Sequence, residues 1–321
     1  MWKSPLSSST PLIVVVGPTA AGKSELALVI AEWFGGEVVS ADAFQVYRGL
    51  DIGTAKLGAE ARRRVPHHCI DVADPDDHYT AGRYAREAAA AIAEVHARGR
   101  ISVLAGGSGF YIRALVDGLA ALPRHDGRWR TALEVVEQRR GAGFLFGMLE
   151  ALDPGWAAAI GRADRQRILR GIEVTLRSGR PMSAMLEEHG WNGPRYQAEW
   201  VGLTWPRPLL YGRIEARVDA MLERGWLEEV RGLLAAGYSR DAPGLRAIGY
   251  RQLVAHLQGR IPLKEAREQI IRATRKYAKR QLTWFRGQTA AVWYELEDDG
   301  ETSRKRLYAR VRGQLRAKLT C

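Results

Sequence analysis

Cysteine is scarce in this sequence: only Cys69 and Cys321 occur among its 321 residues. Because a disulfide framework needs more cysteines, we infer a reducing compartment and expect a cytoplasmic protein. No cluster of cysteines and histidines has the spacing of a zinc site. Long hydrophobic runs are missing as well. No stretch approaches the roughly 18 apolar residues that span a bilayer, so we expect no membrane partner.

The N-terminal segment lacks the apolar core of a signal peptide. Its serines and prolines lead us to expect a short disordered tail over residues 1–10. The whole chain has 46% hydrophobic and 26% charged residues, which is the balance of a soluble globular protein. Its length allows one large α/β domain with an insertion, or two small domains.

Acidic side chains are outnumbered. The 36 aspartates and glutamates face 48 lysines and arginines, which gives a net charge of +12. Such an excess favours a polyanionic partner, of which nucleic acid is the commonest. A genome that uses arginine liberally would produce the same excess, so charge alone leaves both explanations open.

Strands and helices alternate in the first third of the chain. Short buried strands are expected at residues 12–16, 37–40, 69–72 (the weakest) and 101–105. Helices are expected at residues 22–33 and 80–98. This alternation predicts an α/β fold with a doubly wound parallel sheet.

Strand signals disappear between residues 120 and 193, where arginine, glutamate and alanine recur at helical spacing. We therefore predict a helical insertion domain at 120–193 and a core built from residues 11–119 and 194–321. The second part of the core, residues 194–321, is expected to contain strands at residues 199–204 and 291–296. Its helices are expected at residues 208–236, 245–258 and 263–286, with one more in the basic tail.

A phosphate-binding motif follows the first predicted strand. The pattern G-x-x-x-x-G-K-[ST], also the ATP-binding motif of kinases, is matched by Gly17, Pro18, Thr19, Ala20, Ala21, Gly22, Lys23 and Ser24. The glycines let backbone N–H groups face a phosphate, and the following helix N-terminus adds partial positive charge. Lys23 is expected to neutralise a terminal phosphate, and Ser24 to ligate Mg²⁺. The motif predicts a diphosphate or triphosphate site.

The sequence does not clearly contain the second metal-binding acid of an ordinary ATPase. A phosphotransferase needs one at the end of an apolar strand. The strand at 101–105 leads instead into Gly106, Gly107 and Ser108, and Asp71 follows a poor apolar run. The loop therefore indicates phosphate binding without indicating phosphoryl transfer.

Asp42 follows directly on the predicted strand 37–40. Ligands of parallel α/β sheets bind at the carboxyl ends of the strands, so Asp42 is placed to ligate metal through water or to act as a general base. From position alone, a turn or helix-capping aspartate is the more frequent explanation.

Basic residues crowd the last long predicted helix. Residues 263–286 include eight lysines and arginines and two acids, with Tyr277, Trp284 and Phe285 among them. Cations on phosphates and aromatics on unpaired bases are the combination that binds single-stranded RNA loops. The alternative is a solvated helix face with its aromatics in the core. We favour the core for the aromatics and RNA for the charges.

Arginines occur in two further arrangements. Arg213 and Arg217 are four residues apart on one predicted helix face and can clamp one anion together, unless they pair with Glu215 on the surface. Gly249 lies between two arginines in a predicted helix, where glycine costs about 1 kcal/mol relative to alanine. A close approach to a ligand would offset that cost, and so would simple helix packing.

Taken together, these motifs resemble the tRNA dimethylallyltransferase family over residues 11–290. Besides the phosphate loop, the resemblance rests on residues 40–49 (SADAFQVYRG), 51–56 (DIGTAK), 106–111 (GGSGFY), 166–167 (QR), 246–251 (RAIGYR) and 279–287 (KRQLTWFRG). The loop alone is generic. The string DIGTAK and the block KRQ-x-TW are specific, and their order along the chain strengthens the match.

The resemblance implies a P-loop NTPase/kinase-like parallel sheet core with an α-helical insertion domain. It implies that the loop holds dimethylallyl diphosphate with Mg²⁺, and that the dimethylallyl group is transferred to the exocyclic amine of the adenosine next to the anticodon of tRNA. Asp42 would be the base. Lys23, Ser24 and Arg213 would hold the diphosphate, with Arg217 as a weaker second clamp.

The resemblance also implies which residues bind the tRNA anticodon stem-loop, with Gln45 and Ser108 on the target adenosine. The expected set comprises Asp42, Ala43, Phe44, Gln45, Ser108, Gln166, Arg167, Ile168, Leu169, Arg170, Arg246, Ala247, Ile248, Gly249, Tyr250, Arg251, Lys279, Arg280, Gln281, Trp284 and Arg286. The family usually has serine at Ala43 and threonine at Ser108, so only the hydroxyl at 43 is lost. We expect a monomer.

Three rival functions share part of these motifs. A P-loop small-molecule kinase has the loop and the fold, but leaves the basic C-terminal helix unexplained. A non-catalytic RNA-binding protein has no need of the Lys23–Ser24 pair or of Asp42. A relative that prenylates free adenylate shares the first motifs but needs no grip on an anticodon.

Overall fold

The computed structural model describes residues 11–141, 143–190 and 195–319; the predicted tail at 1–10 lies outside them. The chain divides into two compact units, Met1–Val116 with Arg195–Cys321, and Asp117–Pro194. The first unit contains the sheet and the phosphate loop.

Six parallel strands form the sheet of the first unit, in the order β3-β2-β4-β1-β5-β6. Their bounds are β1 (Leu12–Val16), β2 (Glu37–Ser40), β3 (His67–His68), β4 (Ser102–Ala105), β5 (Ala198–Thr204) and β6 (Val292–Glu295). In the register of the central strand, Val14 lies between Leu104 and Trp200. The α/β fold class predicted from the sequence is confirmed.

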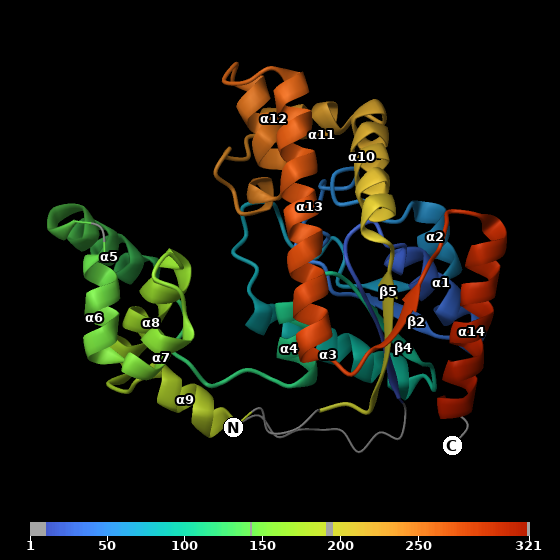
Figure 1. Cartoon of the computed structure of the whole chain (residues 1–321), viewed down its shortest axis with the longest axis horizontal. Helices are drawn as coiled ribbons and strands as arrows, with labels where there is room; N and C mark the ends of the chain where they lie inside the picture. Colours follow the sequence, from blue (N-terminus) through green and yellow to red (C-terminus); the bar gives the residue numbers. More distant parts are fainter. Residues whose placement is uncertain (1–10, 142, 191–194, 320–321) are drawn as a thin grey trace. The chain divides into compact units, whose positions relative to one another are not determined.

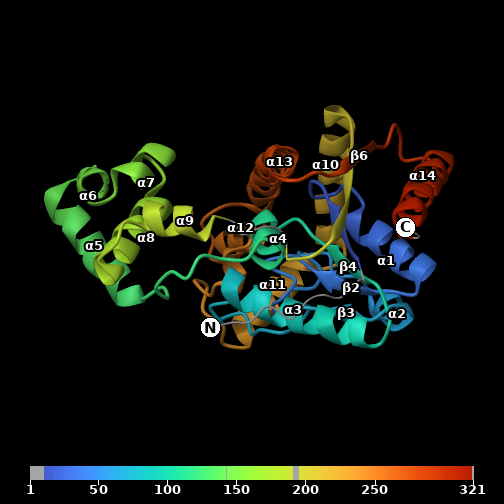
Figure 2. The same ribbon diagram turned by 90° about the horizontal axis from the view of Figure 1, so that it is seen from below.

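Helices cover both faces of the sheet (Figures 1 and 2). Every side chain of β1 is fully buried, as expected of a parallel strand with two covered faces. Val14 belongs to the core shared with α3 (Ala81–Ala97) and α4 (Gly109–Val116). Val15 belongs to the core shared with α1 (Lys23–Phe34) and α14 (Glu301–Leu319).

Another group of helices lies beyond the carboxyl end of β5, where the chain enters α10 (Figure 1). It consists of α10 (Arg207–Glu223), α11 (Trp226–Ala235), α12 (Tyr250–Leu257) and α13 (Leu263–Gln288). The short α2 (Ala59–Arg64) follows the loop after β2. Because ligands of parallel sheets bind at the carboxyl ends of strands, helices α10 to α13 are in a position to line a binding site.

The second unit is built from helices alone within its described residues. They are α5 (Gly127–Arg140), α6 (Phe144–Leu152), α7 (Pro154–Ala159), α8 (Arg165–Ser178) and α9 (Met182–His189). Leu133, Leu149 and Ile172 are central to its core. Its buried Glu173 accepts hydrogen bonds from His125, from the backbone of Asp126 and from Arg170.

Three predicted elements are wrong. Residues 69–72 form no strand, because Cys69 and Asp71 adopt left-handed backbone angles, with φ of 60° and 57°. The helix predicted at 208–236 is two helices, separated at Gly225 with φ 93°. The helix predicted at 245–258 is a short 3₁₀ turn (Gly244–Arg246) followed by α12, which Gly249 precedes with φ 96°. A glycine with positive φ interrupts an α-helix because the helical conformation requires negative φ.

Candidate active site

The phosphate loop joins β1 to α1, and its backbone is fixed by its glycines. Gly17 and Gly22 have φ of 145° and 93°. A Cβ on Gly17 would overlap the carbonyl oxygen of Leu203 on β5, so only glycine fits. Gly22 is the residue that precedes α1. The loop is therefore built into the sheet, with the positive end of a helix dipole directed at any phosphate it holds.

Lys23 is folded back onto its own loop. Its Nζ donates a hydrogen bond to the carbonyl oxygen of Pro18 at 2.8 Å. Burial and, after it, the positive charge of Arg217 lower the pKa of Lys23 to about 7, although Asp42 opposes the shift. Two cations thus lie close together in a desolvated place, and an anion between them would relieve their repulsion.

Ser24 occupies the first turn of α1 and is exposed. Among the described residues, no group of three histidine, cysteine or acidic side chains is placed to hold a metal ion. In a phosphate loop of this pattern the Ser/Thr hydroxyl binds a Mg²⁺ ion, which keeps several waters and takes further ligands from the substrate phosphates. The described residues therefore fit a magnesium site completed by water and substrate phosphates, and they do not fit a site whose ligands all come from the protein.

Arg213 and Arg217 project from α10 toward the loop. Arg213 Nε donates to the carbonyl oxygen of Ala20 at 2.9 Å, its guanidinium lies 4.2 Å from the ring centroid of Trp205, and it pairs with Asp299. Arg217 lines a cavity beside the loop. Glu215 pairs with Arg267 and Arg275 on α13.

Asp42 is both a turn aspartate and a cavity residue. Its Oδ1 accepts hydrogen bonds from the backbone N–H of Phe44 at 2.9 Å and of Gln45 at 3.3 Å. The Ser108 hydroxyl oxygen accepts a third, from the backbone of Ala43 at 2.8 Å. The turn therefore orients the carboxylate at the end of β2, so Asp42 is a turn aspartate, and its role as metal ligand or general base stays a prediction.

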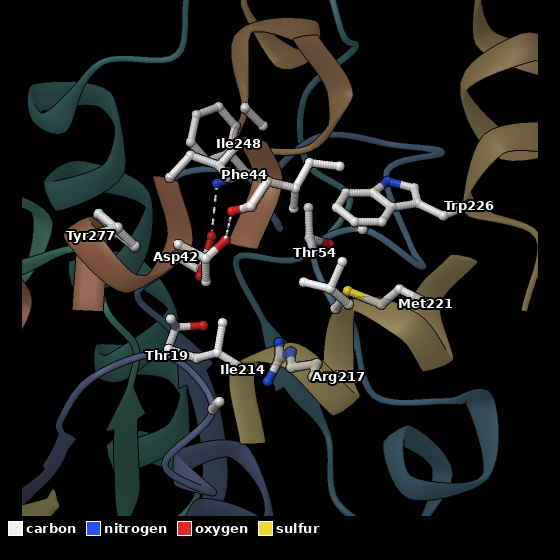
Figure 3. Close-up of a pocket in the computed structure, with 16 residues that line it drawn as sticks. Thr19, Asp42, Phe44, Thr54, Ile214, Arg217, Met221, Trp226, Ile248 and Tyr277 are labelled. Atoms are coloured by element: carbon white, nitrogen blue, oxygen red, sulfur yellow. Dashed lines mark hydrogen bonds between the residues drawn. The ribbon is translucent and has the colours of Figure 1, made fainter. Parts of the chain in front are cut away.

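The cavity next to Asp42 has a polar end and an apolar wall (Figure 3). Asp42, Thr54 and Arg217 face one space, together with Thr19 of the phosphate loop. Its apolar lining comes from Ile214, Val218, Met221, Trp226, Ile248 and Ile270. The volume is about 140 Å³, and an apolar cavity of roughly 150 Å³ holds benzene. A five-carbon chain fits.

Gln281 on α13 is buried between two loops and does not form part of an RNA-facing surface. Its side-chain oxygen accepts the backbone N–H of Thr19 at 2.8 Å, and its amide nitrogen donates to the carbonyl oxygen of Gly107 at 2.8 Å. Tyr277 donates to the same carbonyl at 3.3 Å. Burial raises the pKa of Tyr277 to about 12, with a further contribution from Asp42, so Tyr277 stays a neutral donor.

The other residues of the KRQ-x-TW block divide by exposure. Trp284 packs on Gly109, where a Cβ would overlap the indole, and Phe285 is fully buried. These aromatics belong to the core side of α13, as favoured from the sequence. Lys279, Arg280 and Arg286 are exposed and available to a polyanion.

Residues 246–251 also divide by exposure. Arg246 and Arg251 are exposed, whereas Ala247, Gly249 and Tyr250 are buried. A Cβ on Gly249 would overlap the Trp226 ring, so close packing accounts for this glycine. Ala247 and Ile248 line the cavity. A direct RNA contact by side chain is therefore left to the two arginines of this block.

Within the second unit, α8 presents only part of its predicted RNA-binding stretch. Gln166 and Arg167 are exposed. Ile168 and Leu169 are core residues at 4% exposure, so their side chains cannot reach an RNA. Arg170 is directed at Glu173 and at the carbonyl oxygen of Pro123.

Several cavity residues were not singled out from the sequence. Thr54 belongs to the string DIGTAK, so that motif did carry a signal. Met221 and Trp226 follow helical spacing and look like ordinary core residues, which gives no signal.

No helix within the described parts of the chain is both long and apolar enough to cross a bilayer.

Comparison with known proteins identifies the family of this chain. Residues 45–288 match the sequence model of a family described as IPP transferase. A curated protein of Geobacter sulfurreducens named tRNA dimethylallyltransferase is 49% identical over 90% of this chain and 93% of its own length. One of Symbiobacterium thermophilum with the same name is 42% identical over 97% of each chain.

Two solved structures share the fold. The full-length tRNA isopentenylpyrophosphate transferase of Bacillus halodurans is 36% identical, with a TM-score of 0.71 over 97% of each chain. A eukaryotic dimethylallyltransferase, captured acting on tRNA, is 26% identical, with a TM-score of 0.77 over 92% of this chain and 78% of its own. By sequence and by fold, this chain belongs to the IPP transferase family, whose curated members are named tRNA dimethylallyltransferases.

Proposed function

We propose that this protein transfers a dimethylallyl group from dimethylallyl diphosphate to the exocyclic amine of the adenosine next to the anticodon of tRNA, releasing diphosphate. One observation supports the proposal above all. A carboxylate (Asp42), a cation (Arg217) and an apolar wall face a single cavity beside a phosphate loop. A kinase needs no such hydrocarbon lining next to its transferring phosphate.

The chemistry divides between the two ends of the site. At the loop, Lys23, Arg217 and the backbone amides stabilise charge on the departing diphosphate as the bond between its oxygen and the allylic carbon breaks. Arg213 contributes once it leaves Asp299. At the other end, the lone pair of the adenine amine forms the new C–N bond. Asp42 takes the proton that the amine loses.

Ser24 is the residue that would hold Mg²⁺ next to the diphosphate. The ion would supply further neutralisation of the leaving group when it is bound. Because the target base cannot reach the cavity while stacked, it must be flipped out of the anticodon loop. We expect the RNA phosphates to be contacted by exposed cations, namely Arg246, Arg251, Lys279, Arg280 and Arg286.

The test uses labelled dimethylallyl diphosphate with Mg²⁺ and unmodified tRNA. A tRNA without the anticodon-adjacent adenine and free AMP are the controls. We expect label on the intact tRNA alone. Label on AMP would assign the protein to adenylate prenylation. No label on any acceptor, with ATP consumed when it is added to the same mixture, would favour the kinase.

Two further expectations accompany this function. We propose that the protein works as a monomer in the cytoplasm. Sedimentation of the free protein and of its tRNA complex measures the first directly. A complex with two protein chains for each tRNA would contradict it.

A further inference from the structure

The carboxylate of Glu229 on α11 collects four hydrogen bonds from two other segments. Its Oε2 accepts the backbone N–H groups of Asp51 at 2.9 Å and Ile52 at 2.6 Å. Its Oε1 accepts the N–H of Gly53 at 3.3 Å and the hydroxyl of Tyr250 at 2.5 Å. One side chain therefore satisfies three consecutive amides of a loop that lies more than 170 residues away in the sequence.

That loop is a wall of the cavity. Gly53 and Thr54 line it together with Asp42. The carbonyl oxygen of Thr54 accepts a hydrogen bond from Gln45 Nε2 at 3.0 Å, and the backbone N–H of Gln45 donates to Asp42 Oδ1. A continuous path of bonded groups thus leads from Glu229 through the loop to the carboxylate of Asp42.

The loop has little freedom to adopt another position. A Cβ on Gly53 would overlap the Trp226 indole and would lie 2.6 Å from the Tyr250 ring, so the backbone rests directly on this aromatic pair. At its other end the buried Lys56 donates to the carbonyl oxygen of Tyr47 at 2.6 Å and to Asp51 at 2.8 Å. Glu229 lies on α11 together with Trp226, and its carboxylate is the group of that helix that accepts hydrogen bonds from the loop backbone.

We infer that Glu229 is a positioning residue for the reaction: it holds the loop 51–54 against the cavity and, through Gln45, keeps Asp42 in its reactive orientation. This inference rests on the proposed function. In Glu229→Gln one acceptor oxygen becomes an NH₂ group, so donors at that end lose their acceptor. The diphosphate loop belongs to another segment and keeps its contacts.

The measurement is transfer of labelled dimethylallyl diphosphate to unmodified tRNA by the full chain. We expect Glu229→Gln to lower kcat by about 10- to 100-fold, because an ångström of misplacement costs about that much. The KM for dimethylallyl diphosphate should stay close to that of the unaltered protein. Glu228→Gln is the matched control. Glu228 is the neighbour of Glu229 in the sequence, and its exposed carboxylate forms an ion pair with Arg231 on the same helix.

The outcomes separate the inference from the function it rests on. Unaltered protein that transfers no label would overturn both. Active unaltered protein, with Glu229→Gln of lower melting temperature but equal kcat, would reduce Glu229 to a structural role and overturn the inference. If Glu229→Gln does not fold, Tyr250→Phe decides. It removes one of the four bonds, and a smaller loss of kcat supports the inference, whereas an unchanged kcat contradicts it.

Discussion

The side-chain oxygen of Gln281 accepts a hydrogen bond from the backbone N–H of Thr19 at 2.8 Å, across 262 positions of sequence. This bond joins α13 to the phosphate loop. The same helix carries the exposed cations Lys279 and Arg280 one turn or less away. The helix that carries these exposed cations thus also supports the phosphate loop.

Replacing Gln281 with leucine should weaken binding of dimethylallyl diphosphate about tenfold. The substitution leaves the N–H of Thr19 without its acceptor, at about 1–3 kcal/mol. It also leaves the carbonyl oxygen of Gly107 with the longer hydrogen bond from Tyr277 alone. Titration calorimetry with the diphosphate measures the effect. Gln288→Leu, at the exposed end of α13, is the control. Equal affinities for both variants would show that the loop does not depend on α13.

Diphosphate binding should weaken as the pH rises above 7. Burial lowers the pKa of Lys23 to about 7 in the free protein, so Lys23 is largely neutral above that pH. A bound diphosphate favours the charged ammonium and raises its pKa, so binding at pH 8 takes up a proton. Calorimetry in buffers of different ionisation enthalpy measures that uptake.

Lys23→Met is the control for the titration of the diphosphate itself. The difference between its proton uptake and that of the unaltered protein isolates the contribution of Lys23. The same uptake in both proteins would mean that Lys23 is already charged at pH 8 without a ligand.

Neutralising Lys279 and Arg280 together should weaken tRNA binding and flatten its salt dependence. Each phosphate contact that is lost removes about 0.7 from the slope of log K against log salt for single-stranded nucleic acid. Fluorescence anisotropy over a salt titration measures the slope. The control removes the same charge from Lys305 and Arg306, which are exposed on α14. Identical slopes for both double variants would mean that the cations of α13 have no special contact.

Gly249→Ala should destabilise the first unit by about 2–5 kcal/mol. A Cβ there would overlap the Trp226 ring, and the backbone has a φ of 96°, so overpacking adds to backbone strain. Gly259→Ala is the matched control, because its φ is also positive, at 71°, but no atom lies within 4 Å of the added carbon. Urea unfolding measures both. Equal losses would show that packing on Trp226 is unimportant.

The sequence predicts the parts of this fold that depend on local patterns. β1 (Leu12–Val16) and β2 (Glu37–Ser40) agree with prediction residue by residue, because short β-branched runs buried on both faces have few alternatives. The helix breaks at Gly225 and Gly249 were missed. A glycine inside a helical pattern does not reveal whether its φ is negative or positive. At position 249 glycine is required because the Trp226 ring occupies the place of a Cβ, and the sequence does not show this contact.

The candidate site divides in the same way. Lys23 and Asp42 stand in contiguous motifs and could be singled out from the residues around them. Gln281 was expected to bind tRNA because the family resemblance implies it, while its partners Thr19 and Gly107 are 262 and 174 residues away. Glu229 carried no signal at all, since its function comes from a loop that folding brings to it.

The central claim is that Asp42 removes the proton from the adenine amine. The direct measurement is single-turnover transfer from labelled dimethylallyl diphosphate to tRNA by Asp42→Asn, with tRNA affinity measured in parallel. Asparagine keeps the Oδ1 that accepts from Phe44 and Gln45, so the turn survives while the base is lost. We expect the rate to fall about 100-fold or more with tRNA binding unchanged. A variant that transfers the group at the full rate would remove Asp42 from this role.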